Sequence, residues 1–167
     1  GEVVTNSAPA SLELADGHVV ECGGWKLYDF ETGDLINESD DLNKLQCIFT
    51  YEKRTRLVWQ WKLLKMLTVQ NFDDDLATVY VNDEPTTNGQ RVAVDSSVKI
   101  ELRDFRNDYY FRYAPASQTD RALALDCWEG VPEGYEKVNP ATFDVDGDLT
   151  ITPNVDVKGF CWTLDTA

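Results

Sequence analysis

Apolar and polar residues alternate with a period of two along much of the chain. In LVWQWKL (57–63), leucine and tryptophan alternate with valine, glutamine and lysine. The segment SSVKIELRDF (96–105) repeats the pattern with valine, isoleucine and leucine on one side. Such alternation predicts β-strands with one buried face. Further runs with strand character lie at 76–82, 108–113, 121–128 and 148–155.

Turn-forming residues separate these runs. Asn88-Gly89, between two strand-like segments, is the strongest hairpin signal. Helical signal is limited to SDDLNKLQ (39–46), and KLLKML (62–67) extends the strand pattern that precedes it. Many short strands, frequent turns and little helix predict an all-β fold, either an antiparallel β-barrel or a curved two-sheet sandwich.

The length of 167 residues suits one domain with a substantial core. No linker or internal repeat divides the chain, so we expect a flexible N-terminal arm over 1–16 and a single β domain over 17–167. No stretch approaches the roughly 20 apolar residues of a membrane span. The start at Gly1, without a charged n-region, is expected of a mature form whose signal peptide has been removed.

The charge balance narrows the range of partners. The chain has 30 acidic and 15 basic residues, a net charge of −15. Such a surface repels phosphate backbones and anionic lipids, which argues against nucleic acid and membrane-surface partners. The acidity fits a solubilising surface, or a protein that works in salty or calcium-rich fluid.

The cysteines indicate the redox compartment. Cys22, Cys47, Cys127 and Cys161 are widely spaced, and His18 is the one histidine, so a zinc site has almost no ligands. An even number of such cysteines predicts two disulfides and an oxidising compartment, with three pairings open.

A glycosylation sequon supports the same location. Asn37-Glu38-Ser39 lies in a polar segment rich in Asp and Asn. Together with the cysteines, it predicts a secreted glycoprotein.

Catalysis has little support in the sequence. A serine or cysteine nucleophile needs a base, and His18 lies close to a cysteine expected to be bridged. Nucleophile-elbow, zinc-protease and phosphate-loop motifs do not occur. We therefore expect no enzymatic activity, and a carboxylate-based hydrolase is the residual alternative.

The segment DVDGDLT (144–150) is a candidate calcium loop. Asp144, Asp146 and Asp148 alternate around Gly147, which resembles the start of an oxygen-ligand loop. Val155 stands where an EF-hand has its bidentate glutamate. A β-hairpin turn with Asp-Gly at its tip is the simpler interpretation.

Aromatic residues are dense, with five Trp, seven Tyr and seven Phe. Side chains two apart on a strand share a face, so the aromatic residues of WQW and YYFRY form rows. Such rows fill a core or line a pocket for an apolar ligand. The candidate ligand-binding residues are Trp25, Trp59, Trp61, Tyr109, Phe111 and Tyr113.

Several segments resemble the lipocalins. Gly23 and Trp25 match their Gly-x-Trp element, QCIFTYEKRTRLVWQW (46–61) is similar to their second strand, and TDRALALDC (119–127) is similar to a later Thr-Asp segment. The resemblance implies a barrel that carries small hydrophobic molecules. The arthropod pigment-binding members imply bridges between Cys22 and Cys127 and between Cys47 and Cys161.

Two other secreted families share features with the chain. CWEGVPEGY (127–135) and ITPNVDVKGFC (151–161) are similar to late segments of the ependymin-related proteins, which have a deep apolar cavity between curved sheets. Cys22-Gly23-Gly24, followed by Cys47, resembles the opening of a CUB module.

These observations predict a secreted, non-enzymatic carrier of a small hydrophobic ligand of lipid, retinoid or carotenoid type, with no required cofactor. The alternative is an extracellular protein- or glycan-binding interaction module, CUB-like and assisted by Ca²⁺. An exposed edge strand or a second aromatic face would allow a homo- or hetero-oligomer. Bridges from Cys22 to Cys127 and from Cys47 to Cys161 favour the carrier, and a bridge from Cys22 to Cys47 favours the module.

Overall fold

The computed structural model describes residues 1–106 and 122–158, and this part of the chain consists of strands and turns without helix. The all-β prediction is therefore confirmed. The chain folds into two compact units, Gly1–Leu64 and Lys65–Ala167, where the sequence suggested one β domain. Unit 1 and unit 2 are described separately.

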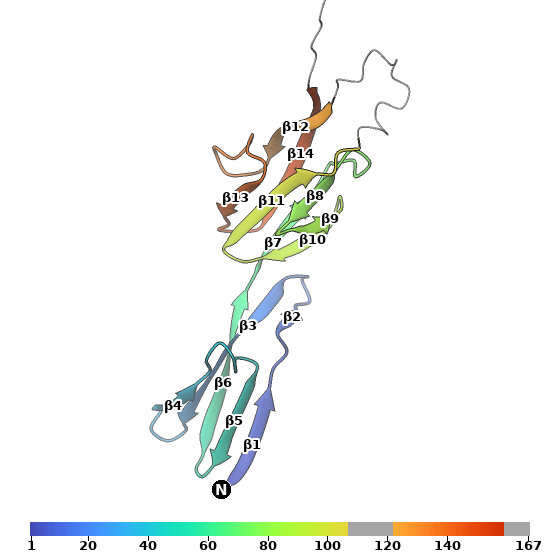
Figure 1. The fold of residues 1–167 in the computed structure, drawn as a ribbon. Helices are drawn as coiled ribbons and strands as arrows, with labels where there is room; N and C mark the ends of the chain where they lie inside the picture. Colours follow the sequence, from blue (N-terminus) through green and yellow to red (C-terminus); the bar gives the residue numbers. More distant parts are fainter. Residues whose placement is uncertain (107–121, 159–167) are drawn as a thin grey trace, which may run out of the picture. The chain divides into compact units, whose positions relative to one another are not determined.

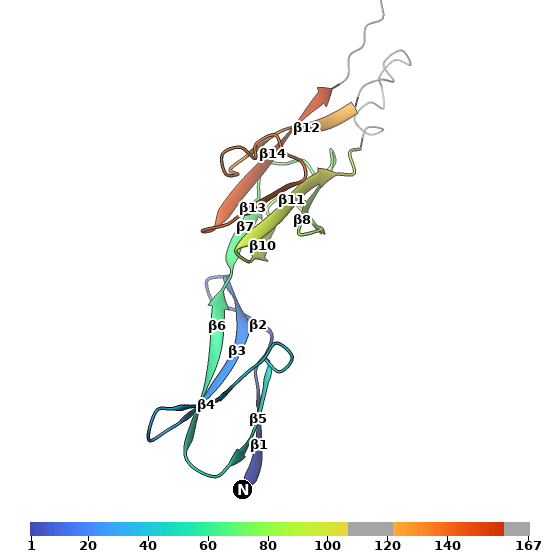
Figure 2. The ribbon, with the colours of Figure 1, turned by 60° about the vertical axis from the view of Figure 1, so that its left-hand side comes forward.

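Unit 1 contains two open sheets. β1 pairs only with β5, whereas β3 is central in the other sheet, with β6 on one side and β2 and β4 on the other. The six strands are labelled in Figure 1, and the turned view of Figure 2 shows the β1–β5 pair apart from β3 and β6. The strands are β1 (Glu2–Ser7), β2 (Ser11–Glu13), β3 (Val19–Asp29), β4 (Leu35–Glu38), β5 (Gln46–Tyr51) and β6 (Thr55–Leu63).

Strand β3 supplies most of the core of unit 1. Trp25 and Leu27 lie two apart on its inner face, and they pack with Cys47 of β5. The ladder with β6 has a bulge between Cys22 and Gly24. Gly24 has φ +122°, and a Cβ there would lie 2.0 Å from the Ser39 hydroxyl oxygen, so the bulge requires glycine.

Unit 2 is a sandwich of two four-stranded sheets, in the orders β10-β7-β14-β12 and β13-β11-β8-β9. All pairs are antiparallel except β14 with β7, which is parallel. Fifteen buried residues fill the space between the sheets. The strands are β7 (Lys65–Val69), β8 (Thr78–Val81), β9 (Glu84–Thr86), β10 (Arg91–Val94), β11 (Ser97–Arg103), β12 (Ala122–Glu129), β13 (Ala141–Asp144) and β14 (Leu149–Lys158).

The turns of unit 2 differ from those expected. The hairpin is β8–β9, and its turn residues Asn82 and Asp83 both have positive φ, 50° and 68°, as a type I′ turn requires. Asn88-Gly89 instead connects β9 to β10, which belong to different sheets. The Asp146-Gly147 turn connects β13 to β14, which also belong to different sheets, so it is not the tip of a β-hairpin.

Three further expectations differ from the structure. Residues 2–7 of the expected arm form β1, which is paired with β5 along its whole length. In the segment 39–46, residues 39–45 form bends and turns rather than helix, and β5 begins at Gln46. The strand pattern that runs through 62–67 is divided at Leu64, because β6 belongs to unit 1 and β7 to unit 2.

The barrel and the two disulfides are not supported. The sheets formed by the described residues are open. Cys22 and Cys47 are buried free thiols of unit 1, and Cys127 is a half-buried free thiol of unit 2. Cys161 lies outside the described residues. Spacing along a chain does not determine whether two sulfur atoms come within bonding distance, so the cysteine count alone could not establish the bridges.

Candidate functional site

Two adjoining cavities lie between β4 and β5 in unit 1. The first has a volume of about 280 Å³ and the second about 350 Å³. Both are lined by Asn37 of β4 and Ile48 of β5, so they form one groove, which we call the β4–β5 groove. The first is also lined by Trp25, Glu38, Asp40, Asn43 and Gln46, and the second by Leu27, Ile36, Phe49, Thr50, Glu52, Lys53 and Thr55.

The second cavity has an apolar base and an exposed apolar rim. Leu27 is buried, and Phe49 is half-buried against the same core. Ile36 and Ile48 are 45% and 55% exposed although both are large and apolar. Their exposure leaves apolar surface that a ligand would remove from water, at roughly 25 cal/mol per Å².

The outer edge of β5, the edge that faces away from β1, borders the groove. Ala8 N–H donates to the Leu45 carbonyl at 3.1 Å, and this pair directly continues the β1–β5 register. In an antiparallel ladder, hydrogen-bonded pairs recur at every second position. The N–H and C=O groups of Ile48 and Thr50 therefore point to the outer edge. Among the described strands, none pairs with that edge.

The position of Gln46 agrees with this alternation. Its N–H donates to the Asn43 carbonyl at 3.2 Å, and its own carbonyl accepts from the Trp25 indole at 2.9 Å. Both partners lie on the outer side of β5. The protein itself thus satisfies the first outward-facing residue of the edge, while Ile48 and Thr50 follow it along the groove.

The opposite wall, β4, has a partly capped edge. Ser39 N–H donates to the Trp25 carbonyl, so the β3–β4 register directs the backbone of Glu38 away from β3. The Glu38 N–H is bound by the side-chain oxygen of Asn37 at 2.9 Å. The free edge of β5 is therefore the better place for a new strand.

Trp25 fixes the end of the groove nearest the turn 39–45. Its indole N–H is shared between the carbonyls of Asn43 and Gln46, each at 2.9 Å, and the side chain is 5% exposed. The Asp40 carboxylate accepts from the N–H groups of Leu42 and Asn43, at 3.1 and 2.9 Å. These bonds hold the turn against β3 without a helix.

The charges of the groove are distributed unevenly. The charged side chains of the first cavity, Glu38 and Asp40, are both acidic. Glu38 has a partner outside the cavity, Lys26, at 3.5 Å. At the other end, the Lys53 ammonium pairs with Asp29. That ion pair, with backbone N–H groups of Glu31 and Thr32, lowers the Asp29 pKa from 3.8 to about 2.

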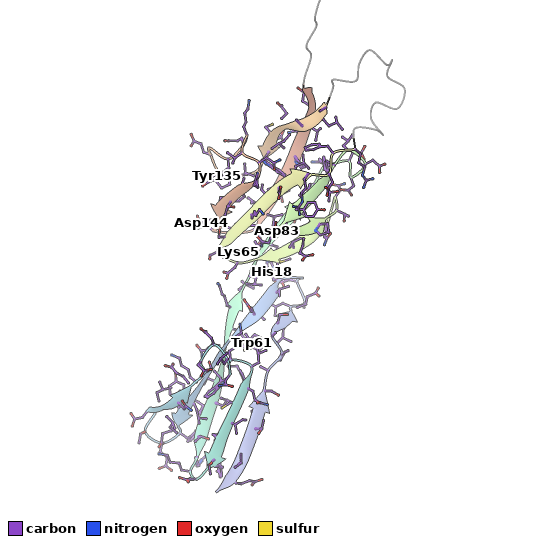
Figure 3. All side chains as sticks on the ribbon, viewed as in Figure 1. His18, Trp61, Lys65, Asp83, Tyr135 and Asp144 are labelled. Carbon is purple, nitrogen blue, oxygen red and sulfur yellow. The ribbon has the colours of Figure 1, made fainter. Side chains whose placement is uncertain are left out.

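The candidate aromatic residues lie in different places. Trp25 lines the groove, whereas Trp59 is half-buried on β6 and donates to Asn6 at 3.3 Å. Trp61, labelled in Figure 3, is 38% exposed. Tyr109, Phe111 and Tyr113 lie outside the described residues.

Sequence reasoning missed Ile36 and Ile48. Their signal was available: β4 and β5 contain isoleucines in short strands beside polar turns. Nothing in a single sequence placed these two strands on opposite sides of one groove. Asn37, which the sequence marks only as a glycosylation sequon, lines both cavities.

Metal and base chemistry have little support in the part of the chain that the structure describes. No group of three or more His, Cys, Asp and Glu residues is placed to hold a metal ion there. In the candidate calcium loop, Asp148 accepts from the Met66 N–H at 2.9 Å, and Asp144 ends β13 (Figure 3). His18 Nδ1 lies 3.2 Å from the carboxylate of Asp16.

Comparison with protein-family models, with curated proteins and with solved structures gives no match. Within residues 1–106 and 122–158, no helix has the length and apolar character needed to cross a membrane.

Proposed function

We propose that the protein is a non-enzymatic interaction module whose unit 1 binds its ligand in the β4–β5 groove. The observation that supports this most directly is the combination, at one place, of exposed isoleucines and an unpaired strand edge. Exposed apolar side chains scattered over a surface need no explanation, but those around a cavity indicate a binding site.

The chemistry of the groove favours a ligand that can form hydrogen bonds. Side-chain amides line the first cavity, and two threonines and two charged groups line the second. A purely apolar ligand would cover these groups without pairing them, at a cost of roughly 1–3 kcal/mol for each buried group. A peptide or a glycan provides the partners that such groups need.

A carrier of a small apolar molecule is the second candidate. The cavity of about 350 Å³ falls within the usual size range of ligand pockets, roughly 300–1,000 Å³, and four apolar side chains border it. Those side chains are Leu27, Ile36, Ile48 and Phe49. Lipid, retinoid and carotenoid ligands would use this end of the groove alone.

Three probes separate these candidates: a displayed library of random peptides, a glycan array and retinol. Peptide or glycan binding supports the module, and binding of retinol alone supports the carrier. Ile48→Lys places a charge in the groove and should abolish binding. Val3→Lys is the matched control, because Val3 is 65% exposed on β1 and lines neither cavity. Equal loss in both variants, or binding to none of the probes, contradicts the proposed site.

Asn37 is both a residue of the β4–β5 groove and the asparagine of the predicted glycosylation sequon. An N-linked glycan on this side chain would occupy the groove, since Asn37 lines both cavities. The binding experiments therefore use unglycosylated protein. Secretion and glycosylation stay predictions from the sequon and the four cysteines, and intact mass of the protein from its native source tests them.

A further inference from the structure

We infer that the ligand of the β4–β5 groove is an extended peptide that adds to the outer edge of β5 as a third strand. This inference rests on the proposed function and specifies its ligand. Strand addition uses main-chain hydrogen bonds for affinity and side-chain pockets for specificity. Unit 1 offers both at the same place.

The main-chain part is provided by Ile48 and Thr50. The β1–β5 register directs their N–H and C=O groups to the outer edge, where among the described strands none pairs with them. The N–H and C=O groups of Gln46 also point to the outer edge, but they are already bonded to the Asn43 carbonyl and the Trp25 indole. The part of the edge that can accept a new strand therefore begins after Gln46. A peptide opposite Ile48 and Thr50 continues the ladder from that point.

The β1–β5 sheet also gains most from a third strand. A two-stranded sheet is marginal in water, whereas three strands with an apolar face are stable. All residues of β1 and β5 except Val4, Cys47 and Phe49 are exposed. An added strand would cover Ile48, which is 55% exposed, and would lie over the base formed by Leu27 and Phe49.

The two cavities predict the side chains of the peptide. In a strand, every second residue points to the same face. One residue of the peptide enters the cavity based on Leu27 and Phe49 and is apolar. Another faces the cavity whose charged groups, Glu38 and Asp40, are both acidic, and is Lys or Arg. The net charge of −15 strengthens the preference for a basic peptide.

The test compares two displayed peptide libraries with the same composition. In the first library, every second position is Ser or Thr, and the positions between them are filled in turn by Lys or Arg and by a large apolar residue. In the second library, the same residues stand in blocks. The alternating library should be enriched on the immobilised chain. Equal enrichment of the blocked library, or preference for acidic peptides, overturns strand addition.

Two proline variants test the edge itself. Thr50→Pro removes an N–H from the outer edge of β5, whereas Val3→Pro removes one from the opposite edge of the same sheet, because Val3 and Thr50 are register partners. With peptides selected from the alternating library, Thr50→Pro should weaken binding about tenfold, and Val3→Pro should leave it unchanged. Equal effects overturn the inference.

Amide hydrogen exchange on the unaltered chain gives a readout that does not depend on folding of a variant. Peptide binding should slow exchange at Ile48 and Thr50 and leave Val3 and Thr5 unchanged. Binding in the groove without this protection overturns strand addition but keeps the proposed function. Loss of all peptide, glycan and retinol binding overturns the proposed function as well. A dimer that Thr50→Pro dissociates, with no peptide bound, shows that a second copy occupies the edge instead.

Discussion

The two units differ in how many of their apolar side chains they bury. Twelve large apolar side chains are exposed among the described residues, and all except Val138 belong to unit 1. The main core cluster of unit 2 has fifteen buried residues, whereas that of unit 1 has three, Trp25, Leu27 and Cys47. Unit 2 has a filled core, and unit 1 leaves apolar surface exposed.

This difference explains why the candidate site belongs to unit 1. In the described part of unit 2, the apolar side chains are buried against one another between two sheets, whereas a unit with a small core and open sheet edges can gain further stability from a partner. Regions with little buried apolar surface also open most readily. The comparison predicts that substitutions in the core of unit 2 affect stability most, and that substitutions around the groove mainly affect binding.

The largest effect is expected for Trp128→Ala in unit 2. Trp128 is 1% exposed, and its indole N–H donates to the Val138 carbonyl at 3.0 Å. Removal of the ring leaves a large cavity and an unpaired carbonyl, so the free energy of unfolding should fall by about 3–5 kcal/mol. Urea unfolding followed by circular dichroism measures the change.

Trp61→Ala is the control for that measurement. Trp61 is 38% exposed on β6, and its loss should cost less than about 1 kcal/mol. A cost for Trp61→Ala as large as that for Trp128→Ala would contradict the difference between the units.

A smaller effect is expected for Trp25→Phe in unit 1. The substitution keeps an aromatic ring in the core but removes the N–H that the Asn43 and Gln46 carbonyls share. The free energy of unfolding should fall by about 1–2 kcal/mol, and the turn 39–45 should exchange its amides faster. Unchanged exchange there would show that the indole does not hold the turn.

Strand positions were largely predictable because burial on one face imposes a period of two. In β11, Val98, Ile100 and Leu102 are buried and alternate with residues that are half-exposed. The same rule was less informative for β6, where Trp59 is half-buried but Trp61 is exposed. Alternation predicts which residues share a face of the strand. How deeply each of them is buried depends on the other strands that pack against that face.

The division into two units and the groove were not predictable from the pattern. The run through Leu64 contains no turn signal, because neither glycine nor proline stands between the start of β6 and the end of β7. The groove depends on which edges remain unpaired, and that is a property of sheet order. Ile36 and Ile48 are twelve positions apart in sequence and meet only through the fold.

The stability of unit 1 should depend on acidity through Asp29. Its pKa is lowered from 3.8 to about 2 because Lys53 and two backbone N–H groups stabilise the carboxylate. The stabilisation is fully present above pH 3.8 and is lost as the pH falls through about 2. The urea midpoint, followed by the amide signals of Glu31 and Thr32, should decrease over this window.

Asp29→Asn is the matched variant for the acid titration. It keeps a side-chain oxygen for the N–H groups of Glu31 and Thr32 but cannot titrate or pair with the charge of Lys53. Its urea midpoint should change less between pH 3.8 and about 2 than that of the unaltered chain. An identical acid profile in both proteins would assign the loss to other carboxylates.

The smallest effect is expected for Leu42→Ser, which tests whether every exposed apolar residue of unit 1 contributes to binding. Leu42 is 93% exposed in the turn 39–45 and lines neither cavity. Its replacement should change the free energy of unfolding by less than about 0.5 kcal/mol and leave peptide affinity unchanged. Since Ile48→Lys should abolish the same binding, the pair separates a groove residue from an isolated apolar side chain. Weaker binding by Leu42→Ser would extend the ligand contact beyond the groove to the turn 39–45, and the acidic Asp40 and Asp41 beside Leu42 would then contribute to the preference for basic peptides.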